Sequence, residues 1–446
     1  MAAPTHPSFG DRGQRIGLRL ITKVGSLPVL GNPDVRRTVE SLLYRGSKGA
    51  FGAIEVIEAA SRRPFPSRTG RGDPTRSAPV RPRREFDLTP SEDQELIRSA
   101  AARLADDVIR PAGARADAER SVPEAVRHAA ADLGLSLIGV PSELGGIAEE
   151  RSAVTAALVL EELARGDLGI ATALLAPAAV ATALASYGSS AQQATYLPAF
   201  TSESAPARAS LALMEQGPLF DPLSPTTTAT TRGSDLVING AKSLVVGAAE
   251  ADLLVISVLV DGAPHLVLVE AGTRGVTVAD DPAMGIRAAC TGRIALDDVV
   301  VPATNLLGTS EDHLDAVRRS RLAWSAAACG TAQAALDQLI PYVLTREAFG
   351  EPIAHRQAVA FTVADIAIEL AGLRLVVWRA ASRLDQGRDA ARLIAHARQL
   401  TATHAAQIGS HAVQLLGGHG FVKEFDNERW YRDLRGAGVL EGVLLT

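Results

Sequence analysis

The sequence predicts a mainly α-helical protein with a central β domain: an N-terminal helical domain, a small antiparallel β domain and a C-terminal four-helix bundle. Apolar residues make up 47% of the chain but aromatic residues only 4%, a composition that favours closely packed helices. Helical periodicity before residue 208 and after residue 310 gives way to short β-branched runs between them. The length of 446 residues favours two or three domains.

The front of the chain differs from the rest in charge. The whole chain has a formal net charge of -5, yet residues 1–85 hold 16 Lys and Arg against 7 Asp and Glu. We expect a basic N-terminal extension over 1–60 and an Arg/Pro-rich linker over 61–87. The extension could touch anionic lipid as a peripheral membrane contact, or be a solvated tail. It lacks the continuous apolar core of a secretory signal, so it is not expected to be removed. A cytoplasmic setting is expected because the two cysteines lie too far apart to suggest a disulfide framework.

The N-terminal helical domain is expected over 88–207. Thr89, Pro90, Ser91 and Glu92 combine cap candidates, an early proline and a first-turn acid, a typical helix start. Apolar residues then recur at helical spacing through Val108. Further helices are predicted over 122–133, 152–165 and 170–187.

The middle β domain is expected over 208–310. Its predicted strands are short β-branched runs separated by turn residues, at 236–238, 253–260, 265–269, 276–278 and 298–301. The C-terminal bundle, over 311–446, is predicted from Ala/Leu-rich helices at about 314–344, 354–385 and 388–416.

Several kinds of function are disfavoured. Cys290, Cys329 and His419 have no partners at catalytic or metal-ligand spacing, so neither a disulfide framework nor a metal site is expected. No run approaches eighteen uninterrupted apolar residues, so a transmembrane segment is not predicted. The acidic main part of the chain predicts no nucleic-acid partner.

Four motifs have a specific order and spacing. The first is Arg346-Glu347-Ala348-Phe349-Gly350 with Gln357 downstream, and the second runs from Gln414 through Gly417-Gly418 to Phe421. Tyr431-Arg432-Asp433 and then Glu441-Gly442 complete the series. Weaker matches are Asn239-Gly240 with Lys242, Met284-Gly285 with Arg287, and Arg321 with Gly330 nine residues later. From about residue 88 to the end, the chain resembles the acyl-CoA dehydrogenase family of flavoproteins.

The resemblance implies FAD-dependent α,β-dehydrogenation of an acyl-CoA to a 2-enoyl-CoA, within fatty acid metabolism. Glu441 would take the α proton, and the hydride would go to flavin N5. A carboxylate can approach an acidified carbon at hydrogen-bond distance, and an apolar surround would suit this role. Small uncharged neighbours such as Gly438 and Leu440 are consistent with such a dry pocket. By composition alone Glu441 would be a solvated tail residue; its spacing from Asp433 favours the base.

The resemblance also implies the other contacts. Arg346 would clamp the cofactor pyrophosphate, and Phe349 and Gln357 would lie against FAD bound mainly by a neighbouring subunit of a homodimer or homotetramer. Gln414, Gly417 and Gly418 would approach the adenine or phosphate end of that cofactor. Arg321 would meet CoA, and an electron-transfer flavoprotein would accept the electrons. The alternatives are purely structural. Arg346 and Arg321 could be surface arginines, Phe349 could pack in the core, and Gly417-Gly418 could simply end a helix.

Two flavin-contact motifs depart from the family pattern. The segment from Met214 to Asp221 lacks the usual hydroxyl residues and has Phe220 in place of a small serine, close to the expected substrate path. Val246 stands where a Thr or Ser is usual, and Val443 replaces the threonine that usually follows the Glu-Gly pair. Each lost hydroxyl forfeits about 1 kcal/mol of hydrogen bonding. An alternative is therefore a weak or inactive subunit that assembles with an active paralogue.

Overall fold

The fold was analysed in a computed structural model that describes residues 89–147, 151–201, 207–217, 220–442 and 445–446. The predicted extension, the predicted linker and the substitution at Val443 lie outside the described residues.

The N-terminal domain is helical, as predicted. Its helices are α3 (Glu92–Leu104), α4 (Arg110–Glu119), α5 (Glu124–Asp132), α6 (Ala153–Gly166), α7 (Leu168–Tyr187) and α8 (Ser190–Tyr196). Ser91 caps α3 and forms a capping box with Gln94, which satisfies backbone groups that would otherwise lack partners. A π-helical turn, Ala105–Ile109, joins α3 to α4.

Helix α7 is the core helix of this domain. It is long and apolar enough to cross a membrane by length and composition alone, yet 89% of its most apolar window is buried inside the protein. The apolar residues of α7 lie on every face of the helix and not along one stripe. This is typical of a helix at the centre of a large domain. Helices α4, α6 and α8 pack against α7, and α3 packs against α6.

The middle domain is one sheet of eight strands. They are β1 (Ala209–Ala212), β2 (Thr228–Arg232), β3 (Asp235–Val245), β4 (Leu253–Val260), β5 (Ala263–Glu270), β6 (Val276–Asp280), β7 (Gly292–Pro302) and β8 (Leu306–Leu307). The order is β6-β7-β3-β2-β4-β5-β8, and β1 pairs with β4. Most pairs are antiparallel, but β4 runs parallel to both β1 and β2, so the sheet is mixed and not purely antiparallel as predicted.

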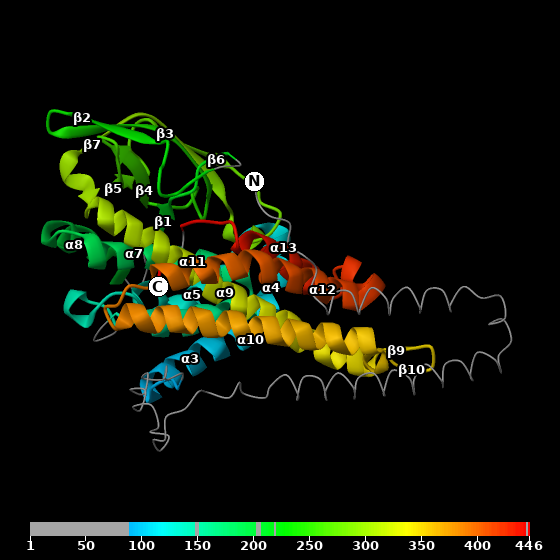
Figure 1. The fold of residues 1–446 in the computed structure, drawn as a ribbon. Coiled ribbons are helices and arrows are strands. Elements are labelled where there is room, and N and C mark those ends of the chain that lie inside the picture. The colour runs from blue at the N-terminus through cyan, green and yellow to red at the C-terminus, as the bar shows by residue number, and fades with distance from the viewer. Residues whose placement is uncertain (1–88, 148–150, 202–206, 218–219, 443–444) are drawn as a thin grey trace, which may run out of the picture. The chain divides into compact units, whose positions relative to one another are not determined.

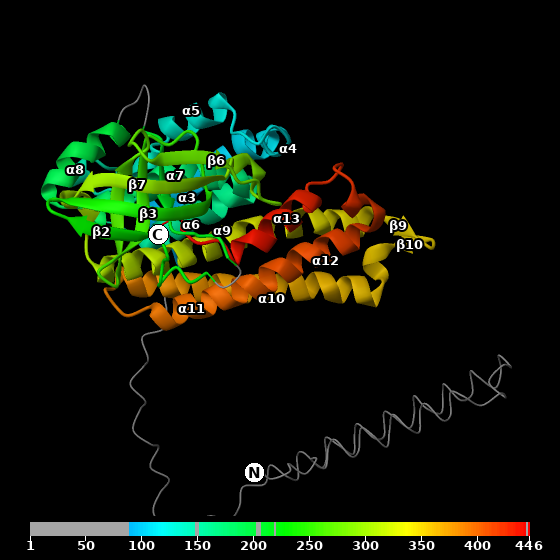
Figure 2. The same cartoon turned by 90° about the horizontal axis from the view of Figure 1, so that it is seen from above.

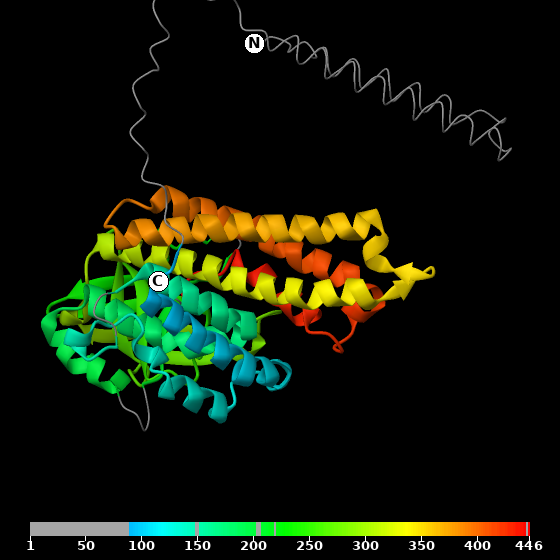
Figure 3. The same ribbon diagram turned by 90° about the horizontal axis from the view of Figure 1, so that it is seen from below.

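The C-terminal part is a bundle of long helices. Its elements are α9 (Ser310–Thr345), a small hairpin of β9 (Glu347–Ala348) and β10 (Glu351–Pro352), α10 (Gln357–Asp385), α11 (Ala391–Leu400), α12 (Ala406–Leu416) and α13 (Asn427–Ala437). A π-helical turn, Thr401–Ala405, links α11 to α12. The yellow and orange helices run side by side toward the hairpin (Figure 3).

The N-terminal helices, the sheet and the C-terminal bundle pack against one another. The sheet lies over the N-terminal helices, and the bundle extends away from both toward β9 and β10 (Figures 1 and 2). The predicted fold class is confirmed, because helices, a central sheet and a helical bundle follow in that order.

Candidate active site

Glu441 lies just beyond α13, where the chain turns back toward the N-terminal domain. Its side chain is buried, with only 7% of the residue exposed. An isolated buried carboxylate is costly, so its partners decide what it can do.

Two arginines hold the carboxylate. Arg321 of α9 places its Nε 3.0 Å from Oε1 and 3.1 Å from Oε2, and its Nη2 2.9 Å from Oε1. Arg398 of α11 places its Nη2 3.1 Å from Oε1 and donates a second hydrogen bond to the carbonyl of Ala437. The apolar surround expected from the neighbouring sequence is therefore not what the structure shows. Oε2 accepts a hydrogen bond from Arg321 alone, which leaves it acceptor capacity for a proton.

The backbone after the carboxylate is fixed just as firmly. The carbonyl oxygen of Gly442 accepts hydrogen bonds from Ser320 Oγ and Trp324 Nε1, both at 2.8 Å. Gly442 has a φ of +76°, a region that favours glycine. A Cβ there would meet the Leu213 side chain at 3.1 Å. One turn of α9 therefore anchors the segment that carries Glu441.

The Met284-Gly285 motif packs directly on the Arg432-Asp433 motif. A Cβ on Gly285 would lie 2.4 Å from the carbonyl oxygen of Arg432, and the Ile286 N–H donates to the Asp433 carboxyl. Burial, and then the nearby Asp167 carboxylate, raise the pKa of Asp433 above its usual range. The Met284-Gly285 and Arg432-Asp433 motifs therefore form one joint between sheet and bundle.

A buried ion pair ties the first β-domain motif to the sheet. Lys242 Nζ lies 2.7 Å from Glu215 Oε1, and Thr226 and Thr227 donate four further hydrogen bonds to the same carboxylate. Burial opposes ionisation of Glu215, but Lys242 and the two threonines bring its pKa down to about 2. This pair is structural, and it keeps the strand that leads to Met214 in place.

The residues predicted to contact flavin from this subunit are apolar. Val246 is 1% exposed and belongs to the main hydrophobic core, against which half-buried Met214 packs. The carbonyl oxygen of Met214 accepts from the Ser243 N–H, and that of Val246 accepts from the Ser210 hydroxyl. Phe220 is half-buried, and its N–H donates to the carbonyl of Gly217.

The remaining predicted cofactor residues gather at the far end of the bundle. Arg346, Gln357 and Gln414 are exposed, as are Gly417 and Gly418, and Phe349 is 94% exposed. Among the described residues, none of the three polar side chains has a hydrogen-bond or ion-pair partner. Tyr342 joins the two motifs. Its carbonyl accepts from the Arg346 N–H, and its hydroxyl lies 3.1 Å from the Leu416 carbonyl and 2.9 Å from His419 Nδ1.

The surroundings of Glu441 and the exposed residues at the far end of the bundle are far apart. Arg321 lies within α9 and Arg346 directly follows its last residue, 25 positions further on, a separation of roughly 38 Å at the usual rise per residue. The structure brings Glu441 and Arg321 together and separates both from Arg346, Phe349, Gln357 and Gln414. The expected contact of Arg321 with CoA stays a prediction.

Sequence reasoning missed three residues of this site. Arg398 lies in an ordinary amphipathic helix, and no pattern there pointed to a buried carboxylate. Trp324 and Ser320 also gave no sign that they donate to Gly442. A tryptophan in an otherwise small-residue stretch of α9 was the only available signal.

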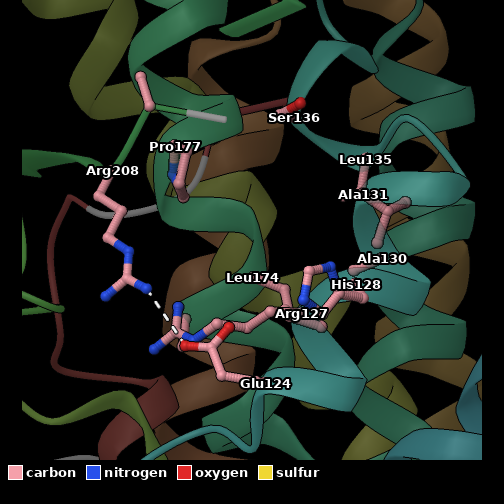
Figure 4. A pocket seen from close by; sticks show the side chains of 12 residues that line it. Glu124, Arg127, His128, Ala130, Ala131, Leu135, Ser136, Leu174, Pro177 and Arg208 are labelled. Atoms are coloured by element: carbon pink, nitrogen blue, oxygen red, sulfur yellow. Dashed lines mark hydrogen bonds and ion pairs between the residues drawn. The ribbon is translucent and has the colours of Figure 1, made fainter. Parts of the chain in front are cut away.

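A separate cavity of about 210 Å³ opens between α5 and α7 (Figure 4). Leu135, Leu174 and Pro177 line its apolar side, and an ion pair between Arg208 and Glu124 crosses its rim. None of the predicted site residues lines it. Within the described ranges, no three His, Cys, Asp or Glu side chains are grouped for a metal ion, and Cys290 and Cys329 are both free.

Three family models match successive parts of the chain. They describe the N-terminal, middle and C-terminal domains of acyl-CoA dehydrogenase and match residues 91–204, 210–299 and 313–444. The chain therefore belongs to the acyl-CoA dehydrogenase family of flavoprotein oxidoreductases.

Individual relatives agree with this assignment. The chain is 31% identical to short-chain specific acyl-CoA dehydrogenase of Bos taurus, over 79% of this chain and 87% of that protein. It is 32% identical to cyclohex-1-ene-1-carbonyl-CoA dehydrogenase of Syntrophus aciditrophicus, with the same coverage. A solved structure of PigA with FAD and proline is similar at a TM-score of 0.73 and 25% identity, over 80% of this chain and 95% of that one.

Proposed function

We propose that this protein is an FAD-dependent dehydrogenase that converts an acyl-CoA to a 2-enoyl-CoA, with Glu441 as the base. The observation that carries the proposal is the buried carboxylate of Glu441, held in one orientation by Arg321 and Arg398 with acceptor capacity left on Oε2. A general base needs a fixed position within reach of the proton that it removes.

The residues present fit the pyrophosphate part of FAD well, but those expected at the flavin ring offer it fewer hydrogen bonds. Arg346, Gln357 and Gln414 are exposed and unpartnered among the described residues, and a guanidinium fork suits a pyrophosphate. Met214 and Val246 offer apolar packing but no side-chain donor to a flavin ring. When bound, FAD supplies the hydride acceptor.

The chain's own groups would divide the remaining tasks. Glu441 takes the α proton on Oε2, while Arg321 and Arg398 keep the carboxylate oriented. Ser320 and Trp324 hold the adjacent backbone through the Gly442 carbonyl. The Glu441 N–H would donate to the thioester oxygen, because negative charge develops there as the proton leaves.

A second copy of the chain would complete each site. Arg346 lies too far from Glu441 for both to serve one flavin with the reacting carbon between them, so we infer that it holds the FAD of a partner subunit. Exposed apolar side chains on α10, among them Phe361, Ile368 and Leu375, favour a homodimer or homotetramer. Electrons would leave to an electron-transfer flavoprotein.

The proposal is tested on the protein purified alone. Flavin absorption in the visible spectrum that bleaches on addition of butyryl-CoA is the expected result. Arg346→Gln should lower bound flavin, whereas Arg388→Gln, on an exposed surface near the end of α10, should leave it unchanged. A colourless protein that binds no added FAD, alone or with a partner, would remove the proposal.

A second candidate function is a non-catalytic subunit that completes the FAD site of an active paralogue. It is favoured by a specific contrast: the exposed end with Arg346 and Gln357 retains the family motif, whereas Val246 is buried in the core and offers no hydroxyl. In this case flavin would be retained only in a co-purified hetero-oligomer. The presence of a firmly held Glu441 favours the enzyme.

A further inference from the structure

The cavity between α5 and α7 has an apolar wall. Ala130, Leu135, Ala173 and Leu174 line it, and each of them is at most 9% exposed. An engineered cavity of about 150 Å³ with apolar walls is large enough to bind benzene, and this cavity measures about 210 Å³. It therefore has room for an apolar group of about the size of one aromatic ring.

Two arginines line the same cavity (Figure 4). Arg127 belongs to α5, and Arg208 directly precedes β1. Arg127 Nη2 lies 2.9 Å and Arg208 Nη1 3.0 Å from the same oxygen, Oε2 of Glu250. Among the described residues, Nε and Nη1 of Arg127 have no hydrogen-bond or ion-pair partner. The cavity therefore combines an apolar wall with charged donors that are not used.

The acidic side chains here leave a place for a further acceptor. Glu124 is the only carboxylate among the described residues that line the cavity. Its contact with Arg208 is 3.3 Å long, and the side chains of Glu124 and Arg208 are 66% and 43% exposed, so this pair contributes little stability. Arg127, Arg208, Glu124 and Glu250 balance one another in charge. The unpaired N–H groups of Arg127, and not a net charge, therefore select the ligand.

We propose that this cavity is a second binding site, which takes a small carboxylate with an apolar body of about one ring. The carboxylate accepts hydrogen bonds from Arg127 and replaces Glu124 as the partner of Arg208, because charged donors bind a carboxylate more strongly than a neutral acceptor. The apolar body lies against Leu135 and Leu174. The ligand joins α5 to the start of β1, so it stabilises the folded protein. The site contains none of the residues assigned to dehydrogenation, and its occupation does not depend on that activity.

The test uses phenylacetate and the full-length protein. Calorimetric titration should show one molecule bound per chain, and thermal unfolding should move to higher temperature as phenylacetate is added. The alcohol 2-phenylethanol has the same ring without the carboxylate and should bind at least about tenfold more weakly, since the charge-assisted hydrogen bonds are lost.

Two arginine variants test the assignment of the donors. Arg127→Gln should lower the affinity for phenylacetate at least about tenfold and leave that for 2-phenylethanol unchanged. Arg115→Gln is the matched control, because Arg115 also pairs with a glutamate but lies on an exposed part of α4; it should bind phenylacetate as the wild type does.

Two alanine variants test the location. Ala131→Leu adds three carbon atoms to a residue that lines the cavity, whereas Ala125→Leu adds them on an exposed part of α5. The first variant should bind both compounds at least about tenfold more weakly, and the second should bind them as the wild type does. If Ala131→Leu does not fold, Ala131→Val should show the same loss to a smaller extent. A wild type that does not bind phenylacetate overturns the proposal, as does wild-type affinity in the folded Ala131 variant.

These outcomes are independent of the proposed dehydrogenase activity. Phenylacetate that binds the wild type but is displaced by butyryl-CoA, with no effect of Arg127→Gln, would place it at the active site and overturn the proposal. A protein that bleaches no flavin but shows the expected variant effects would still support the second site.

Discussion

The guanidinium of Arg321 spans both carboxylate oxygens of Glu441, with Nε at 3.0 and 3.1 Å and Nη2 at 2.9 Å from Oε1. The two residues are 120 positions apart in the chain, one in α9 and one in the segment after α13. This contact fixes the direction in which the carboxylate points, and it joins the first helix of the bundle to the last segment of the chain.

Replacing this arginine should loosen the carboxylate. In Arg321→Met only Arg398 still holds Glu441, and we expect the free energy of unfolding to fall by about 2 kcal/mol, because the broken pair is partly exposed. The rate of flavin bleaching by butyryl-CoA should fall at least about tenfold, since a misdirected group loses most of its catalytic effect. Chemical denaturation and stopped-flow absorbance measure the two effects.

Arg321→Lys is the informative comparison. A lysine ammonium carries the same charge but cannot span two oxygens with one rigid fork. We expect it to recover the stability in part and the bleaching rate poorly. Equal rates for Lys and Arg at this position would show that the fork geometry has no role.

The close packing of the Met284-Gly285 motif on the Arg432-Asp433 motif should leave no room for a side chain at position 285. Gly285→Ala would put a Cβ 2.4 Å from the Arg432 carbonyl oxygen and 2.5 Å from its carbon, so backbone must move. We expect the free energy of unfolding to fall by about 3 kcal/mol, measured in urea. Gly372→Ala is the control on α10, where no atom lies within 4 Å of the new Cβ; it should gain roughly 1 kcal/mol from helix propensity. A loss equal for both glycines would contradict the close packing at Gly285.

Burial of His313 should make the free energy of unfolding depend on pH. It is fully buried, and its Nε2 lies 2.8 Å from Ser257 Oγ. Burial, and then the charge of Lys242, lower the pKa of His313 to about 4. The unfolded state therefore binds more protons between about pH 6.5 and pH 4, so the free energy of unfolding should fall by about 3 kcal/mol as pH drops through this window.

The contribution of His313 is isolated by comparison with His313→Gln, which can keep a hydrogen bond to Ser257 without titrating. Denaturation at pH 7, 5.5 and 4.5 should show a shallower pH dependence in this variant. His355→Gln alters an exposed histidine and should follow the wild type. Parallel curves for wild type and His313→Gln would exclude His313 as the source of the acid sensitivity.

The sequence predicted the elements whose local signals are strong. Strand β4 has the predicted bounds, because its β-branched run lies between polar turn residues. Strands β1 and β2 were missed, since the short Ala-Ser-Leu-Ala and Thr-rich segments lack a clear alternation of apolar and polar residues. The helix predicted over 388–416 is interrupted by a π-helical turn at Thr401–Ala405, which no local pattern indicates.

The site was predictable only in part, because its contacts are long-range. The motif that ends in Glu441 pointed to the base, and a folded chain was needed to show that Arg398 comes from another helix to meet it. The same holds for Ser320, whose hydroxyl donates to the carbonyl of Gly442. Sequence patterns describe neighbours along an element, whereas these partners meet through tertiary packing.

The measurement that tests the central claim most directly is the visible spectrum of Glu441→Gln mixed with butyryl-CoA. Glutamine has nearly the same shape and can still accept from Arg321, so the variant should fold and keep its flavin. Without a base, bleaching should slow by about a thousandfold. Bleaching at the wild-type rate would show that another group removes the proton and would contradict the role of Glu441.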